Sequence, residues 1–173
     1  MDDIVHQIDK AFTNREYPGD ENITCCTYDT KNGGKYDGPC YECVRIAEFF
    51  RGKFWRELSA KQLRSQSAAG SLFTVKAYCY YLPAYLTAAL QNPEELDVCV
   101  GDLTCAFGPE PKYAYGQDRL SKTLGMLSDV ELQVVLRYLR YRCELEEDSL
   151  GYYARSISNV ERALSKGTTA DAP

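Results

Sequence analysis

The stretch from Thr74 to Gln91, TVKAYCYYLPAYLTAALQ, decides the fold. It is apolar on nearly every side at helical spacing, so it predicts a helix at the centre of the molecule. Thr74 can cap the first turn of this helix. Pro83 should kink or split it, because proline lacks a backbone donor and clashes with the preceding turn. We expect the tyrosines between Tyr78 and Tyr85 to pack in the core, with their hydroxyls reaching towards the surface.

Amphipathic segments lie on both sides of this central stretch and predict further helices. Ser128 and Glu131 form a capping-box pattern that opens the longest of them, and Ala68-Ala69-Gly70 is predicted as a break. The predicted helices are Asp2–Asn14, Cys40–Arg51, Ser59–Gln66, one from Asn92-Pro93 through Leu96, Val98 and Cys99, Arg119–Leu124, Asp129–Glu146 and Leu150–Leu164. No period-two pattern of strand length is present, which favours an all-α single-domain multi-helix bundle over residues 1–166, with a disordered tail at 167–173.

Composition narrows the classes of function. The 173-residue chain has a formal net charge of −5, which argues against nucleic acid and is compatible with a basic protein partner. It contains no apolar run of about 20 residues, so we expect no membrane span. Its acidic N-terminus lacks the features of a signal peptide, so we expect a cytoplasmic protein with reduced thiols. The lone histidine, His6, excludes most Ser/His and Cys/His nucleophile schemes and is expected at the surface.

Four of the eight cysteines lie close together in the sequence. Cys25 and Cys26 are adjacent, and thirteen residues separate them from the Cys40-x-x-Cys43 pair. A Cys-x-x-Cys half-site is typical of zinc centres, so Cys26, Cys40, Cys43 and Cys25 are candidate zinc ligands, and His6 could supply a missing one. The alternatives are plain reduced thiols that pack on a helix face and, third, redox chemistry. The polar loop between the two cysteine pairs is long enough to need a clamp or a function.

Two other features admit both a structural and a functional interpretation. Tyrosine occurs 14 times, and tyrosines outside the core could mark a partner surface. Arg137, Arg140 and Arg142 could bind phosphate, but acidic residues follow them at once. We therefore predict a solvated helix face with internal ion pairs.

Three stretches, Tyr17–Asp20, Phe50–Trp55 and Tyr80–Leu86, together resemble a family of small bacterial proteins of unknown function. The signatures of that family are PYPGD, FRGxxW and YYLPAYL. This chain departs from the first signature, because Glu16 precedes Tyr17 where the family often has an apolar residue. The resemblance implies a bacterial, cytosolic, helical domain, and it transfers no catalytic residue.

These observations favour a non-enzymatic protein-binding domain, and most concretely an immunity protein that binds and neutralises a basic toxin. Acidic charge, small size, many tyrosines and the lack of a catalytic set motivate this hypothesis. The alternative is a zinc-stabilised structural or regulatory module built on the N-terminal cysteines. A small enzyme using a thiolate nucleophile or a tyrosine acid is the third hypothesis.

Overall fold

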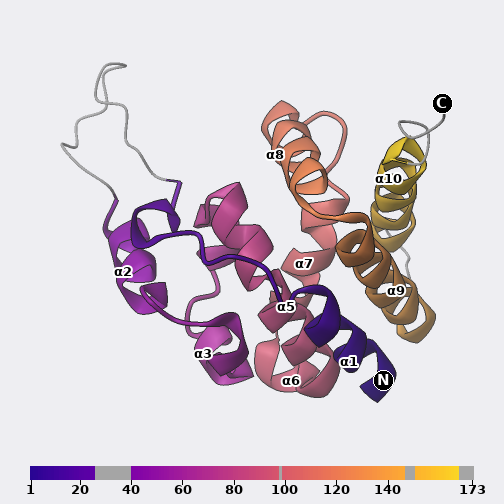
Figure 1. The fold of residues 1–173 in the computed structure, drawn as a ribbon. Helices are drawn as coiled ribbons and strands as arrows, with labels where there is room; N and C mark the ends of the chain where they lie inside the picture. Colours follow the sequence, from indigo (N-terminus) through magenta and orange to yellow (C-terminus); the bar gives the residue numbers. More distant parts are fainter. Residues whose placement is uncertain (26–39, 98, 147–150, 168–173) are drawn as a thin grey trace.

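Helix α5 (Val75–Gln91) lies at the centre of the computed structural model, which describes residues 1–25, 40–97, 99–146 and 151–167 (Figure 1). Thirteen of its seventeen residues are buried, as the apolar pattern predicted. The hydroxyl of Thr74 accepts a hydrogen bond from the backbone N–H of Ala77 at 3.0 Å, so the predicted cap is confirmed. Of the two predicted effects of Pro83, a kink or a split, the split does not occur, because α5 continues through Pro83 from Val75 to Gln91. Neighbouring helices enclose α5, and their packing holds it together across the missing backbone donor.

All the other regular elements that the structure describes are helices too, so the predicted all-α single-domain bundle is confirmed. Their bounds are α1 (Asp2–Ala11), α2 (Tyr41–Phe50), α3 (Ala60–Arg64), α4 (Ala69–Leu72), α6 (Pro93–Leu96), α7 (Cys99–Phe107), α8 (Ala114–Met126), α9 (Asp129–Leu145) and α10 (Tyr152–Gly167), with 3-10 turns η1 (Asp20–Asn22) and η3 (Trp55–Glu57).

Two short helices differ from the prediction. The segment predicted as a break at Ala68-Ala69-Gly70 contains the start of α4. The helix that begins at Pro93 ends at Leu96 instead of running through Cys99, because Asp97 has a positive φ of 52° and turns the chain. An L-residue in that conformation cannot continue a right-handed helix. The chain starts again as α7 at Cys99.

Two further boundaries lie outside the predicted ranges. Helix α8 starts at Ala114, five residues before the expected start at Arg119. Helix α10 includes Gly167, which the sequence assigned to the tail. The rest of the predicted tail, residues 168–173, lies outside the described residues.

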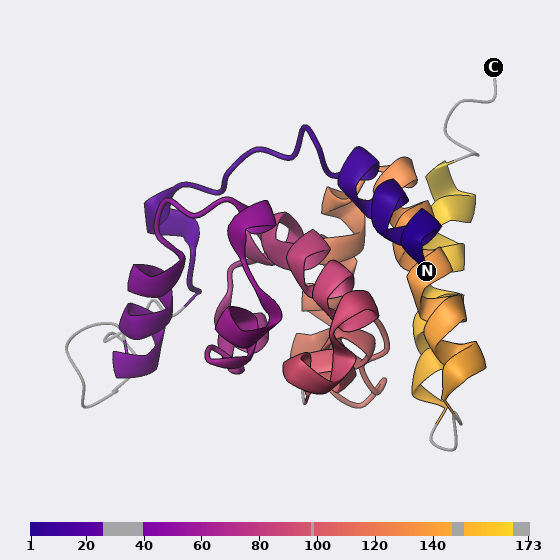
Figure 2. The ribbon, with the colours of Figure 1, turned by 90° about the horizontal axis from the view of Figure 1, so that it is seen from below.

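The helices enclose one connected hydrophobic core that extends from Ile4 to Val160. Helix α1 packs against both α5 and α9, and α10 packs against α9 and α7. Figure 2 shows α1 lying across the bundle and the chain after it running extended towards α2. The N-terminal helix therefore joins the central helix to the C-terminal pair.

The N-terminus of α9 is tied to the segment that follows α1. The predicted capping box is confirmed, since Ser128 Oγ accepts from the Glu131 N–H and the Glu131 carboxylate accepts from the Ser128 N–H. The same carboxylate accepts from Arg15 Nη2 at 3.1 Å, and Arg15 also donates to the carbonyl of Met126. Glu131 is only 5% exposed, so a buried carboxylate links the segment after α1 to the N-terminus of α9.

The arginines of α9 do not all lie on a solvated face. Arg137 and Arg140 are exposed, as predicted, but they pair with Asp3 of α1 and Glu161 of α10 instead of forming the predicted ion pairs within their own helix. Arg142, however, is buried, donates to the Ala89 carbonyl and pairs with Glu146. The prediction of a solvated face was wrong for Arg142 because its side chain points back over α5, where a backbone carbonyl accepts from it.

Candidate functional site

The structure places three of the four candidate zinc ligands. Cys25 is exposed, and its N–H donates to the Leu72 carbonyl at 2.8 Å. Cys40 is the N-cap of α2, where its sulfur accepts from the Cys43 N–H at 3.3 Å, and Cys43 is fully buried. Cys26 lies outside the described residues. Among the residues whose side chains the structure describes, no three His, Cys, Asp or Glu side chains are grouped as metal ligands. The four-cysteine hypothesis stays a prediction.

The three stretches that carry the family resemblance meet in space. The hydroxyl of Tyr17 donates to Asp20 at 2.6 Å and accepts from the Gly52 N–H at 2.8 Å. The hydroxyl of Tyr81 donates to the Phe50 carbonyl at 2.8 Å. We call this cluster of Tyr17, Asp20, Phe50, Gly52 and Tyr81 the tyrosine junction. It clamps the loop after α2 onto the central helix.

The phenol groups of the tyrosine junction have a structural role. Burial is the main cause that raises the pKa of Tyr17 and of Tyr81, with the nearby Asp20 carboxylate acting in the same direction. Both phenols therefore stay protonated at neutral pH and act as hydrogen-bond donors. Gly52 has a φ of +65°, a conformation that favours glycine at this position.

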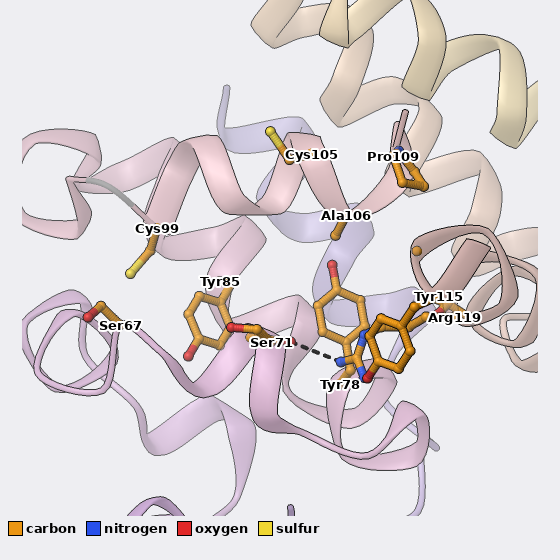
Figure 3. A pocket seen from close by; sticks show the side chains of 13 residues that line it. Ser67, Ser71, Tyr78, Tyr85, Cys99, Cys105, Ala106, Pro109, Tyr115 and Arg119 are labelled. Atoms are coloured by element: carbon orange, nitrogen blue, oxygen red, sulfur yellow. Dashed lines mark hydrogen bonds between the residues drawn. The ribbon is translucent and has the colours of Figure 1, made fainter. Parts of the chain in front are cut away.

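A cavity of about 260 Å³ lies between α4, α5, α7 and α8. Figure 3 shows Tyr78 and Tyr85 rising into it from α5, with Cys99 and Ala106 opposite on α7. Its full lining is Ser67, Gly70, Ser71, Tyr78, Tyr85, Cys99, Cys105, Ala106, Pro109, Tyr115, Gly116, Arg119 and Thr123. The walls are mostly apolar, and the exposed Tyr115 forms part of the rim. An apolar concavity with a few polar groups is the usual form of a ligand site.

Arg119 is the charged residue of this cavity. Its Nη1 donates to the Phe73 carbonyl at 2.8 Å and its Nη2 to the Gly70 carbonyl at 2.9 Å. The guanidinium carbon also lies 5.5 Å from the centre of the Tyr78 ring. These contacts fix the orientation of the guanidinium at one end of the cavity, beside Tyr115 (Figure 3).

Cys79 follows Tyr78 on α5, is fully buried, and has a thiol that is unreactive at neutral pH. Burial raises the pKa of the Cys79 thiol from 9.0 to about 12, so it carries no thiolate at neutral pH. An unfolded chain would release this proton near pH 9, whereas the folded chain retains it, so stability falls as the pH rises above 9. At about pH 11 this group alone should cost about 2–3 kcal/mol.

We therefore predict that Cys79→Ala loses stability less steeply than the wild type between about pH 9 and pH 11. Urea unfolding across that range measures the two slopes, and comparing slopes removes the pH-independent effect of the smaller side chain. Equal slopes would contradict the assignment of this pH dependence to Cys79. The tyrosines also titrate in this range, but they are common to both proteins and affect both slopes alike.

A second concavity is a groove of about 360 Å³ between α1, η3, α5 and α6. Small side chains of α5, including Ala84 and Ala88, form its floor. Asp9 lies on its rim but already pairs with Arg56 at 2.6 Å. Glu95, also on the rim, and its neighbour Glu94 form no ion pair with any residue that the structure describes. Asp9 and Arg56 both line the groove and compensate each other's charge, so Glu95 leaves the lining with one net negative charge, and we call Glu94 and Glu95 the acidic mouth.

Sequence reasoning missed both concavities. It assigned Tyr78 and Tyr85 to the core, which is correct, but a core tyrosine and a cavity tyrosine have the same pattern in the sequence. Arg119 resembles any arginine on an amphipathic helix, and no signal in the sequence distinguishes it. His6 is exposed on α1, as expected.

Within residues 1–25, 40–97, 99–146 and 151–167, no helix has both the length and the apolar character needed to cross a membrane. No curated protein and no solved structure matches the chain. A family model described as a family of unknown function, DUF6714, matches residues 1–162. The expected membership of a family of unknown function is confirmed, while its three signatures and its bacterial origin stay predictions. Because the match takes in nearly all of the 173 residues, the chain belongs to this family, DUF6714.

Proposed function

We propose that this chain is a non-enzymatic protein-binding domain, and specifically a cytoplasmic immunity protein that binds and neutralises a basic bacterial toxin. The net charge of −5 supports a basic partner and disfavours nucleic acid and anionic membranes. We assign no catalytic residue. Buried Cys79 and the raised pKa values of Tyr17 and Tyr81 favour this choice, since these groups stay protonated and serve in packing and hydrogen bonding.

The acidic mouth of the groove is the observation that carries this proposal. Glu94 and Glu95 are exposed in the first turn of α6. The helix dipole favours carboxylates there, but by only about 0.3–1 kcal/mol at exposed sites, and this small effect does not by itself explain why Glu95 lines a groove. A lysine or arginine of the partner could place its alkyl stem on Ala84 and Ala88 and its charge at Glu95.

The test uses the basic product of a neighbouring gene in the native host as the partner. We expect the double variant Glu94→Lys/Glu95→Lys to slow association with that protein by at least about tenfold at low salt, because charges at an interface rim act on the association rate. The wild-type rate should fall steeply as salt rises. Stopped-flow or surface-plasmon measurements give both quantities.

Glu48→Lys/Glu144→Lys is the matched control, because it makes the same change in net charge at two exposed glutamates, on α2 and α9, that form no ion pair among the residues described. Its association rate should stay within about twofold of the wild type at equal salt. An equal loss in both variants would show that only overall charge matters. Failure of every basic neighbouring product to bind the wild type would contradict the immunity function.

The zinc-stabilised module is the alternative proposal, with Cys25, Cys26, Cys40 and Cys43 as ligands. It predicts about one equivalent of zinc in protein purified without added metal. It also predicts that a chelator lowers the melting temperature of the wild type but not that of Cys26→Ser. Elemental analysis measures the metal content, and less than about a tenth of an equivalent would contradict the proposal.

A further inference from the structure

The cavity beside α7 combines apolar walls with a single cation. Of the thirteen described residues that line it, Arg119 alone carries a charge. Arg119 forms no ion pair with any carboxylate whose side chain the structure describes, a set that leaves out residues 102–104 of α7. Arg119 is half-buried, so its charge is only partly hydrated, and an anion beside it would compensate for the water that it has lost.

The structural role of Arg119 accounts for only part of its chemistry. Its bonds to Gly70 and Phe73 satisfy carbonyls at the end of α4, which is a useful contact for the fold. A guanidinium has five N–H donors, and these two bonds use two of them. The remaining three N–H groups, one on each nitrogen, lie in the same rigid plane, and a guanidinium binds carboxylates through such donors. The two backbone contacts therefore preorganise the cation for an anionic ligand.

We propose that this cavity binds a small organic acid, with its carboxylate on Arg119 and its apolar body against the rings of Tyr78 and Tyr85. The volume sets the size of the ligand. An apolar cavity of about 150 Å³ holds benzene, so one of about 260 Å³ accommodates a single ring with a short chain. Ala106 on α7 lies across from the tyrosines and closes the apolar part (Figure 3).

Titration of the wild-type protein with three probes tests the ligand class. The probes are 3-phenylpropionate, its neutral amide 3-phenylpropionamide, and an N-acetylated tripeptide that ends in phenylalanine. We expect the acid to bind with a millimolar or lower Kd, and the amide at least about tenfold more weakly, because hydrogen bonds to charged groups are the stronger ones. Calorimetry or protein-observed NMR measures the affinities.

The tripeptide distinguishes two sources of the same carboxylate. If it binds more tightly than 3-phenylpropionate, the natural ligand is the C-terminus of another protein. If it binds more weakly, the natural ligand is a free acid. Both results support the carboxylate site. Failure of the acid and the peptide alike to bind, or equal affinity for acid and amide, would overturn it.

Three variants locate the site. Arg119→Gln should weaken binding of 3-phenylpropionate at least about tenfold. The matched control is Arg155→Gln, because Arg155 also donates to a backbone carbonyl, that of Gly108 at 3.0 Å, and lies over a tyrosine ring, but it is outside the cavity. This control should bind like the wild type. Ala106→Phe should abolish binding by filling the apolar part while Arg119 stays in place.

The Ala106→Phe variant keeps the proposal testable if Arg119→Gln does not fold. Wild-type affinity in a folded Ala106→Phe protein, or in a folded Arg119→Gln protein, would overturn the assignment. The inference does not rest on the proposed protein partner, since the probes are small and the groove at Glu95 is a separate concavity. Glu94→Lys/Glu95→Lys should bind 3-phenylpropionate like the wild type, so the two proposals can fail independently.

Discussion

Replacement of Glu131 with alanine is expected to lower the free energy of unfolding by about 3–5 kcal/mol, the cost of breaking a buried ion pair by removing one partner. The Glu131 carboxylate accepts from Arg15, from the Ser128 N–H at 2.8 Å and from the Ser128 hydroxyl at 2.9 Å. The Nε of Arg15 lies 3.0 Å from the second carboxylate oxygen without the alignment of a hydrogen bond, so it adds charge attraction. Alanine would leave the Arg15 cation, whose side chain is 18% exposed, without its anion.

Two control variants separate the ion pair from the helix cap. Ser128→Ala removes only the hydroxyl of the cap and should cost about 1 kcal/mol. Glu144→Ala removes an exposed glutamate of the same helix and should stay within about 0.5 kcal/mol of the wild type. Urea unfolding followed by circular dichroism measures all three proteins. A cost for Glu131→Ala no larger than that of Ser128→Ala would show that Arg15 contributes nothing.

Local signals in the sequence were sufficient where one segment determines its own structure. The central helix has an apolar surface on every side and the capping threonine at position 74, and α9 has its capping box, so both were predicted with correct starts. The prediction failed for the short helix α4, because contacts with distant residues stabilise it. The four residues of α4 are held in part by Arg119, which is far away in the sequence and donates to the Gly70 and Phe73 carbonyls.

The candidate sites were less accessible to sequence reasoning than the fold. The cavity forms because Tyr78, Ala106 and Arg119 come together from three helices, and no local sequence pattern predicts which helices pack against one another. The cysteine pattern, in contrast, was prominent in the sequence, but it is also compatible with purely structural roles for the cysteines. Cys40 caps helix α2, and Cys43 is buried in the interior of the protein, which are roles that small polarisable side chains often have.

The aromatic part of the tyrosine junction leads to the second large effect. Tyr81 is fully buried, and its ring stacks on Phe73 with centroids 5.2 Å apart and contacts Phe50 at 4.7 Å. Tyr81→Ala should therefore cost about 3–5 kcal/mol, as for other buried aromatic residues replaced with alanine. Tyr81→Phe keeps the ring and removes only the hydroxyl, which donates to the Phe50 carbonyl and, at 3.3 Å, to the Lys53 carbonyl, and it should cost about 1–2 kcal/mol.

The difference between the two Tyr81 variants decides what holds the loop after α2 against the core. The Phe50 carbonyl also accepts from the Lys53 N–H at 3.1 Å, so it keeps a partner when the phenol is lost, and most of the stabilisation must come from the ring. Tyr41→Ala is the control for tyrosine removal, since Tyr41 on α2 is 83% exposed and should cost less than about 0.5 kcal/mol. Denaturant midpoints of the four proteins measure these costs. Equal losses in Tyr81→Phe and Tyr81→Ala would assign the junction to its hydrogen bond and contradict the packing argument.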